Sequence, residues 1–285
     1  MTWPPRVSMP AATAAAFSDS SAAWRLSDLE RVDIQREAWA HSCDRAPGLA
    51  AVMADAAEAV HDHGAVVVEG VPPRDNTLVL AGHPLGTADP EYNGPAPGTL
   101  VHDLVAGGGR GLPDPLHTDA SFLARPQAYI AMICVRPSPA GDGRTLLARA
   151  VDVADILADR GGHLRLLADP CFPFAVPPMP DPRPDDPVVR LGSVLVTDSG
   201  DARARYRPTR VAPGLRLAPD AVDDEHLAAL RSFENALEQE RIDRSVLLRS
   251  GELLLLDNRR VLHGRSPVGP AGHTRHLKRV KLAAA

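Results

Sequence analysis

The sequence predicts a mainly β fold, a β-sandwich or a jelly roll, with a few helices flanking the sheets. Many short strand-like segments alternate with turns, and the helical segments are few. Hydrophobic residues make up 44% of the 285 residues, which is enough for a core, and no shift in composition marks a second domain. We therefore expect one domain over residues 23–285, preceded by a mobile segment over residues 1–22.

The elements follow in chain order from hydrophobic patterns and from Gly and Pro. A helix over residues 47–64 ends at Gly64, and the buried strand AVVVEGV (65–71) follows it. A strand over 127–135 pairs with 144–150 as a hairpin, and a short helix comes next. The remaining elements are strands over 99–105, 188–198 and 204–212, an amphipathic helix over 223–241, a strand pair around Gly251 and a last strand over 275–283.

Two segments rich in Pro, Gly and Asp are predicted to be long loops. They cover about residues 72–98 and 171–187, and the first holds at most a short element around TLVLA. Long loops inside a compact domain often serve as lids or as binding segments. We therefore expect two lid-like insertions in the domain.

Composition excludes several classes of protein. The net charge of −5 argues against nucleic acid as the main partner, because phosphate binding needs a basic surface. No apolar run approaches the roughly 20 residues that span a bilayer, so no membrane partner is expected. The three cysteines are widely spaced and form no CxxC motif, so a disulfide framework is not expected and the cytoplasm is the expected compartment.

The stretch PLHTDASF (115–122) contains a pair of candidate metal ligands. In a strand, His117 and Asp119 point to the same face, where an imidazole nitrogen and a carboxylate oxygen can bind one ion. The pattern is weak by itself, because any His-x-Asp fits it and two polar residues in a turn would look the same. A third ligand is needed to support a metal site.

His263 is the candidate for that third ligand. Ferrous oxygenases bind iron with two histidines and one carboxylate and leave the opposite face open. His263 lies at the end of the most hydrophobic strand and directly before Gly264, although a surface turn histidine would look the same. An oxo-acid co-substrate would also need a cation that binds a carboxylate with two hydrogen bonds, which favours arginine. Alternation places Arg275 and Arg279 on one face of the last strand.

Taken together, these residues resemble the Fe(II)/2-oxoglutarate-dependent oxygenases of the clavaminate synthase-like, or TauD/TfdA, superfamily. The resemblance covers roughly residues 50–282 and includes the early strand GAVVVEGVP. It is carried mainly by PLHTDASF (115–122), RPQAYIAMICVRPSPAGDGRTLL (125–147), LLLLDNRRVLHGRSPV (253–268) and RHLKRV (275–280).

The resemblance implies a double-stranded β-helix, or jelly roll, as the core. It implies that His117, Asp119 and His263 bind Fe(II), and that O2 is consumed. Arg275 resembles the arginine that binds the C5 carboxylate of 2-oxoglutarate, and Thr145 resembles the threonine that assists it. The candidate substrate-binding residues are Arg279, which matches an arginine that often meets a substrate carboxylate, Arg265, which is a pocket wall or a structural ion pair, and Phe122, which is a substrate contact or core.

The sequence also departs from the family pattern. Many relatives have Glu where Asp119 stands, and a carboxylate there argues against the halogenase variant. The interval from His263 to Arg275 is slightly short, which a trimmed GPAG loop (269–272) would explain. Leu123 stands where a histidine often follows the Phe. Neither predicted lid matches the family, so the substrate stays open.

The expected function is therefore hydroxylation of an unactivated C–H in a small carboxylate-bearing molecule, such as an amino acid or a metabolite derived from one, with a role in secondary metabolism. Desaturation or cyclisation of a natural product or carrier-bound substrate would use the same ligands. A zinc-binding, cupin-like hydrolase and a non-catalytic binding protein are the alternatives from other classes. A homodimer and a carrier-protein partner also stay open.

Overall fold

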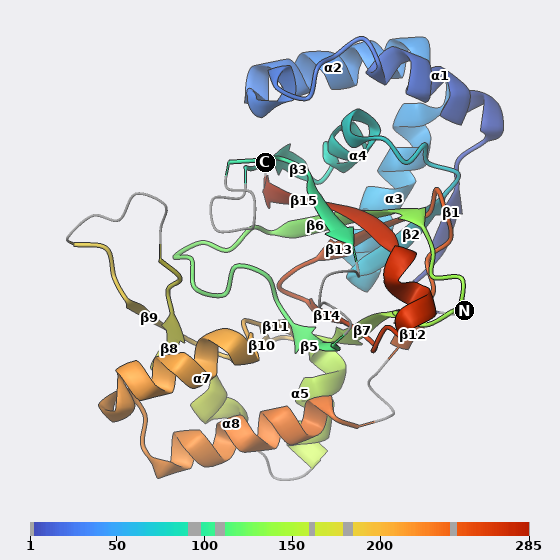
Figure 1. Cartoon of the computed structure of the whole chain (residues 1–285). Coiled ribbons are helices and arrows are strands. Elements are labelled where there is room, and N and C mark those ends of the chain that lie inside the picture. Colours follow the sequence, from blue (N-terminus) through green and yellow to red (C-terminus); the bar gives the residue numbers. More distant parts are fainter. Residues whose placement is uncertain are drawn as a thin grey trace.

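The computed structural model describes residues 3–90, 98–105, 112–159, 163–178, 185–239 and 244–284. In this part of the chain a seven-stranded and a four-stranded sheet face each other, and helices pack on both sides (Figure 1). Side chains from both sheets meet in one buried cluster, which includes Val67 and Leu254 of the large sheet and Leu147 and Val261 of the small one. The predicted mainly β fold, with a jelly-roll core and flanking helices, is confirmed.

The large sheet forms the wall of the barrel next to the N-terminal helices. Its first two strands are parallel and all its other pairs are antiparallel. Along the sheet the order is β1 (Arg6–Ser8), β2 (Ala65–Glu69), β13 (Leu253–Asp257), β6 (Tyr129–Arg136), β15 (His276–Ala284) and β3 (Gly86–Ala88), with β4 (His102–Val105) also paired to β15.

The small sheet forms the opposite wall, and two further strand pairs lie beside it (Figure 1). Its order is β12 (Arg244–Val246), β7 (Thr145–Arg149), β14 (Val261–Arg265) and β5 (Asp114–His117). The further pairs are β8 (Phe172–Ala175) with β9 (Val189–Gly192), and β10 (Leu195–Asp198) with β11 (Asp201–Ala204).

Helices cover both sheets, and among the described residues none is both long and apolar enough to cross a membrane. The helices that pack on the large sheet are α1 (Ala11–Ser21), α2 (Val32–Arg45), α3 (Leu49–His63) and α4 (Asp75–Gly82). Those beside the small sheet are α5 (Ala150–Asp159), α6 (Leu164–Ala168), α7 (Pro208–Leu217) and α8 (Asp224–Leu237). Short 3-10 turns are η1 (Asp28–Glu30), η2 (Pro219–Ala221) and η3 (Pro270–Thr274).

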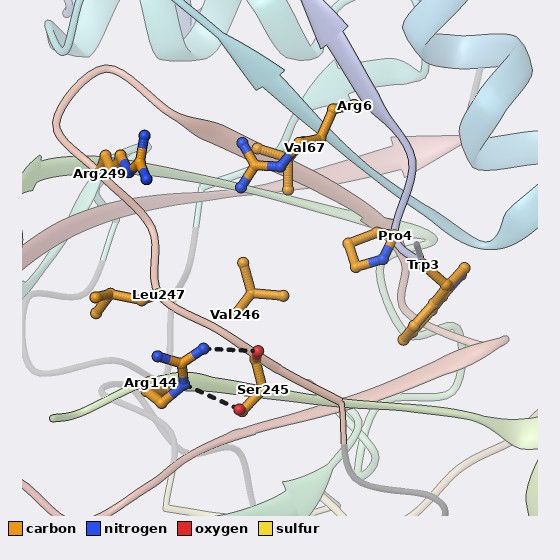
Figure 2. A pocket seen from close by; sticks show the side chains of 9 residues that line it. All are labelled: Trp3, Pro4, Arg6, Val67, Arg144, Ser245, Val246, Leu247 and Arg249. Carbon is orange, nitrogen blue, oxygen red and sulfur yellow. Dashed lines mark hydrogen bonds between the residues drawn. The ribbon is translucent and has the colours of Figure 1, made fainter. Parts of the chain in front are cut away.

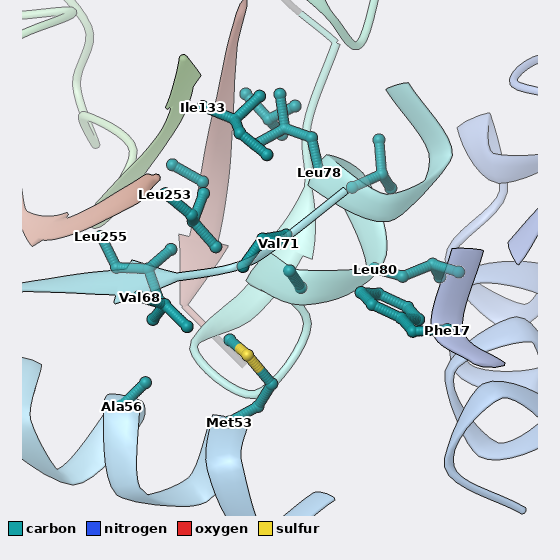
Figure 3. Close-up of a cluster of buried hydrophobic side chains, with 14 of the residues drawn as sticks. Phe17, Met53, Ala56, Val68, Val71, Leu78, Leu80, Ile133, Leu253 and Leu255 are labelled. Carbon is teal, nitrogen blue, oxygen red and sulfur yellow. The ribbon is translucent and has the colours of Figure 1, made fainter. Parts of the chain in front are cut away.

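Alternation along the central strands of the large sheet divides their apolar side chains between two clusters. In β2, Val66 and Val68 pack under the helices, whereas Ala65 and Val67 face the barrel interior. Because both faces of these strands are buried, they read as continuous hydrophobic runs rather than as alternating ones. Figure 3 shows the cluster under the helices, with Val68 near Met53 and with Phe17 beside α4.

The N-terminal segment differs from the expected mobile lead-in. Residues 6–8 form β1 and pair with β2 through Val67 and its neighbours, and residues 11–21 form α1. Phe17 of α1 is fully buried in the cluster of Figure 3. An Ala-rich stretch carries little periodic signal of its own. The regular structure of this segment is therefore stabilised by the burial of Phe17 and by the pairing of β1 with β2.

Three local expectations are also corrected. The predicted hairpin of 127–135 with 144–150 does not form, because β6 and β7 lie in different sheets. The strand pair predicted around Gly251 does not form either, because β12 and β13 also lie in different sheets. The predicted strand over 204–212 is wrong, because β11 ends at Ala204 and the chain enters α7 at Pro208, where proline suits the first turn of a helix. The predicted helix over 47–64 is confirmed as α3, with Gly64 in the left-handed conformation at its end.

The two segments expected to be lids contain regular structure where they are described. Residues 72–90 hold α4 and β3, and Leu78 of α4 is fully buried. Residues 171–178 hold β8, with Phe172 and Phe174 fully buried. Residues 91–97 and 179–184 lie outside the described residues, and a lid function for either segment stays a prediction.

Candidate metal centre and co-substrate pocket

Three predicted ligands come together at one end of the small sheet. His117, Asp119 and His263 each offer a ligand atom, and these atoms lie within 4.8 Å of one another. All three side chains are buried. His117 ends β5 and is directly opposite His263 of β14 in the antiparallel pairing, with ring centroids 4.5 Å apart. Pairing of two distant strands therefore creates the cluster that the sequence predicts.

The residue between the first two ligands turns away from the cluster. Thr118 donates its backbone N–H to the Tyr206 carbonyl at 2.7 Å, and its hydroxyl accepts from the Tyr206 N–H at 3.0 Å. These bonds fix the backbone on the side opposite His117 and Asp119. The alternation expected for His-x-Asp is therefore present, although β5 itself ends at His117.

The two imidazoles present the same ring nitrogen to the cluster. His117 Nδ1 lies 2.8 Å from the Pro115 carbonyl, which assigns the proton to Nδ1 and leaves the lone pair on Nε2. His117 Nε2 and His263 Nε2 lie 3.5 Å and 3.9 Å from the Asp119 carboxylate. Burial, together with the neighbouring His117, holds the pKa of His263 well below its ordinary value. A neutral imidazole is the form that binds a metal.

The Asp119 carboxylate is surrounded by cations as well as by imidazoles. Arg279 Nη1 donates to Asp119 Oδ2 at 2.8 Å, and Lys281 Nζ lies 3.8 Å from the same oxygen. Arg207 Nη1 donates to Asp119 Oδ1 at 3.2 Å. Burial alone would raise the pKa of Asp119, but Arg279, Lys281 and His117 lower it well below its ordinary range. Asp119 is therefore an ionised carboxylate, as a metal ligand must be.

Arg207 and Lys281 were not predicted from the sequence. Lys281 continues the alternation of Arg275 and Arg279 on β15, so that pattern could have identified it. Arg207 lies between β11 and α7, and no local pattern shows that it reaches the cluster. It is brought there by the fold of the chain around the small sheet.

A cavity of about 80 Å³ adjoins the ligand cluster. It lies between the two sheets, because side chains of β15 line one side and side chains of β5, β7 and β14 line the other. Its lining residues are Leu104, Asp114, His117, Met132, Thr145, His263, Gly264, Arg265, Arg275, Leu277 and Arg279. Arg275 and Arg279, which alternation places on one face, thus both line this cavity, together with Leu277 between them.

Arg275 brings a buried positive charge to this cavity. Arg275 directly precedes β15, and its Nη2 lies 3.5 Å from the Thr145 hydroxyl of β7 across the barrel. Burial lowers the pKa of Arg275 to about 10, so the side chain stays cationic at neutral pH. Among the described residues no carboxylate lies within ion-pair distance of it. A buried cation that has only a hydroxyl beside it fits an anionic ligand.

The other two predicted substrate residues differ in position. Arg265 lines the cavity, and its Nη2 donates to the Leu112 carbonyl at 2.8 Å. Phe122 does not line the cavity, because its side chain packs in the apolar cluster between the small sheet and the second group of helices. The Arg210 guanidinium lies 5.2 Å from its ring centroid. Phe122 is therefore part of the core and not of this cavity.

A second cavity, of about 370 Å³, shares no lining residue with the first (Figure 2). Trp3, Pro4 and Val246 line part of it, together with three arginines. Two of these arginines already have protein partners, since Arg6 pairs with Glu252 at 2.8 Å and Arg144 Nε donates to Ser245 Oγ at 2.9 Å. It contains none of the three clustered candidate ligands, so its larger volume does not make it the candidate metal centre.

Comparison with known proteins agrees with this arrangement. No curated protein matches the chain. Among solved structures it is similar to an asparagine oxygenase in complex with Fe(II), 2S,3S-3-hydroxyasparagine and succinate, with a TM-score of 0.75 and 21% identity over 98% of this chain and 93% of the other. It is similar to the non-heme iron oxygenase OrfP in complex with Fe and L-canavanine, with a TM-score of 0.72 and 21% identity over 99% and 94%.

These identities show the fold alone, and the family is shown by a separate comparison. The family model described as "Taurine catabolism dioxygenase TauD, TfdA family" matches residues 45–281, which is most of the chain. The match begins in α2 and ends in β15, so it includes every strand of both sheets except β1, together with the ligand cluster and Arg275. The chain therefore belongs to the TauD/TfdA family of dioxygenases.

Proposed function

We propose that this protein is an Fe(II)- and 2-oxoglutarate-dependent oxygenase that hydroxylates an unactivated C–H of a small carboxylate-bearing substrate, such as an amino acid or an amino-acid-derived metabolite. The observation that carries the proposal is the buried cluster of His117, Asp119 and His263 next to the cavity of Arg275. Family membership supports it. So do structural neighbours whose complexes contain Fe, succinate and hydroxylated amino acids.

The residues present fit an iron ion. Two neutral imidazoles and one ionised carboxylate are the donor set of non-haem Fe(II) oxygenases. His263 Nδ1 is buried and has no hydrogen-bond partner in the described part of the chain, so its ring is held by packing, with Nε2 toward the cluster. In the proposed reaction Fe(II), 2-oxoglutarate and O2 supply the oxidising power, which inserts one oxygen atom into the C–H bond and leaves succinate and carbon dioxide.

Arg275 and Thr145 would bind the far carboxylate of the co-substrate. A guanidinium donates two parallel N–H bonds to a carboxylate, and the threonine hydroxyl adds a third donor. The cavity between them and His263 is small and lined mostly by buried residues, so each charge-assisted bond there is stronger than it would be in solvent. These residues would thus set the position of the keto-acid end relative to the metal ligands.

Arg279 would orient the substrate. Its guanidinium lies at the cluster, 2.8 Å from Asp119 Oδ2, and also lines the cavity. A carboxylate of the substrate that binds it would be held next to the metal ligands. Holding the reacting C–H within reach in this way makes the reaction effectively unimolecular.

A zinc hydrolase is the less favoured function, although zinc also binds two histidines and a carboxylate. A hydrolase has no use for a buried arginine and a threonine that together fit a carboxylate of a co-substrate. The experiment that separates the two is an anaerobic titration of the purified protein with Fe(II) and 2-oxoglutarate. The oxygenase gives a weak charge-transfer band, and amino acids then stimulate succinate formation. Absence of the band and of any succinate would overturn the proposal.

A further inference from the structure

Arg207 reaches the metal-ligand cluster from outside the barrel wall. It lies directly before α7, with its side chain 26% exposed, so it connects the surface with the buried site. Its Nη1 donates to Asp119 Oδ1 at 3.2 Å, and its Nη2 lies 3.6 Å from Asp114 Oδ1. Asp119 Oδ1 is also the oxygen that lies nearest to His117 Nε2, at 3.5 Å. Arg207 therefore occupies the edge of the site where the metal would bind.

A pair of cations contacts the other oxygen of the same carboxylate. Arg279 and Lys281 of β15 contact Asp119 Oδ2 at 2.8 Å and 3.8 Å. One carboxylate thus interacts with cations from two separate elements, one group on each oxygen. A divalent ion bound to Asp119 would share these oxygens and add its own charge. Like charges at this spacing repel unless further anions are present.

The co-substrate does not remove this repulsion at Arg207. Arg207 does not line the cavity of Arg275, and within the described residues its ion-pair partners are Asp119 and the half-exposed Asp114. The remaining anion would come from the substrate. The arrangement has two cationic ends, Arg279 with Lys281 at one oxygen of Asp119 and Arg207 at the other, and both lie beside the metal ligands.

We propose, on the basis of the oxygenase function above, that the substrate is an amino acid with an acidic side chain. Its α-carboxylate would bind Arg279, and its side-chain carboxylate would bind Arg207. A guanidinium or an ammonium side chain would be repelled at Arg207. An amide side chain would offer a neutral acceptor, which forms a weaker bond to arginine than a carboxylate does. Arg207 is thus the residue that determines specificity for the second acidic group.

The test measures binding without turnover. Protein loaded with Fe(II) and 2-oxoglutarate under anaerobic conditions is titrated by calorimetry with L-aspartate, L-glutamate, L-asparagine, L-glutamine and L-arginine. We expect at least one of the two acids to bind tighter than its amide and than L-arginine by about tenfold or more, because bonds to charged groups exceed neutral ones by about this factor. Arg207→Gln should reduce the affinity for that acid by about 10- to 100-fold and change the affinity for its amide little.

The control is Arg216→Gln, which removes the same charge from an exposed position later in α7 and should leave every affinity unchanged. Arg207→Lys keeps the charge and should keep the preference for the acid. If Arg207→Gln does not unfold cooperatively, and is therefore not properly folded, two measurements still test the proposal. They are the comparison of acid with amide binding in the wild type and the preference of Arg207→Lys.

Two kinds of failure can be distinguished. If Fe(II) and 2-oxoglutarate bind but the acids bind no tighter than their amides, or no amino acid binds at all, the specificity proposal is overturned and the oxygenase function is untouched. An equal loss of acid and amide affinity in Arg207→Gln overturns it as well. If Fe(II) or 2-oxoglutarate does not bind to the wild-type protein, the oxygenase proposal itself fails.

Discussion

The side chain of Asn258 forms hydrogen bonds with both the backbone N–H and the backbone carbonyl of Asp119. Its Oδ1 accepts from the Asp119 N–H at 2.8 Å, and its Nδ2 donates to the Asp119 carbonyl at 3.0 Å. Nδ2 also donates to the Gln127 carbonyl at 2.9 Å. Asn258 is buried and follows β13 directly, so a turn at the end of a large-sheet strand fixes the backbone of a proposed metal ligand beside the small sheet.

Asn258→Ala should therefore destabilise the protein and weaken metal binding. Three buried polar groups lose their partner, which we expect to cost about 2–4 kcal/mol in the free energy of unfolding. Affinity for Fe(II) should fall about 10- to 100-fold, the effect of removing an outer partner of a ligand. Urea unfolding and anaerobic metal titration measure the two effects. Asn258→Asp keeps the acceptor for the Asp119 N–H but places a buried carboxylate oxygen against the Asp119 and Gln127 carbonyls, so it should not rescue stability. An alanine variant as stable as the wild type would contradict this role.

Removal of a proposed ligand should abolish metal binding. His117→Ala and His263→Ala each leave only two metal-binding side chains. Removal of an outer hydrogen-bond partner of a ligand lowers metal affinity by about 10- to 100-fold, and we expect removal of a ligand itself to lower Fe(II) affinity by more than that. Metal content after reconstitution, determined by elemental analysis, measures the loss, and 2-oxoglutarate turnover should fall with it. His61→Ala, an exposed histidine at the end of α3, is the control. Turnover that survives His117→Ala would argue strongly against an iron site at this cluster.

Arg275 and Thr145 should affect the co-substrate and not the metal. Arg275→Ala removes one partner of a buried charge pair, so the Kd for 2-oxoglutarate should rise by about 30- to 1000-fold. Thr145→Val removes only a hydroxyl and should raise it about two- to tenfold. Arg275→Lys keeps the charge but loses the forked geometry, so it should lie between them. Equal effects of these variants on Fe(II) affinity would show that they disturb the fold instead.

The interaction between His226 and its carboxylates should make stability depend on pH. His226 Nδ1 lies 2.8 Å from Asp223 and Nε2 lies 3.2 Å from Asp169, and the hydrogen bond to Asp223 raises its pKa. A pKa that is raised on folding stabilises the protein below the unfolded value of about 6.5. This stabilisation is lost as the pH rises through the folded pKa.

His226→Ala should therefore lower the Tm more at about pH 5.5 than at about pH 9, where the wild-type imidazole is neutral. The difference in stability should stay below about 1 kcal/mol, because the pair is partly solvated. In an Asp169→Asn/Asp223→Asn background the effect of His226→Ala should no longer depend on pH. An equal loss at both pH values in the unmodified background would show that only packing against Phe172 is at stake.

The N-terminal helix should contribute to global stability. Phe17 of α1 is fully buried beneath the helices of the large sheet (Figure 3), so Phe17→Ala should cost about 3–5 kcal/mol in the free energy of unfolding. Val32→Ala is the control, since Val32 is 47% exposed. Chemical denaturation measures both. A loss below about 0.5 kcal/mol for Phe17→Ala, the range of surface substitutions, would mean that the segment is not part of the core.

Much of the candidate site could be predicted from the sequence because its chemistry is local. His117 and Asp119 share a face through the two-residue period of extended backbone, and the same period places Arg279 of β15 on the same face as Arg275, which directly precedes that strand. The need for a third donor identified His263. These predictions depend only on side-chain type and strand geometry, so they did not require knowledge of which strands are neighbours.

Strand neighbours, the order of the N-terminus and the position of Arg207 were decided only by the tertiary structure. Sequence adjacency suggested a hairpin of 127–135 with 144–150, yet β6 and β7 lie in different sheets. Phe17 gave no periodic signal but is fully buried, and Arg207 follows a short edge strand but contacts Asp119. The free energy of these contacts comes from burial and pairing between segments far apart in the chain, and local patterns carry no record of such partners. The sequence therefore predicted the candidate metal ligands and the face on which they lie, and the fold determined which charges surround them.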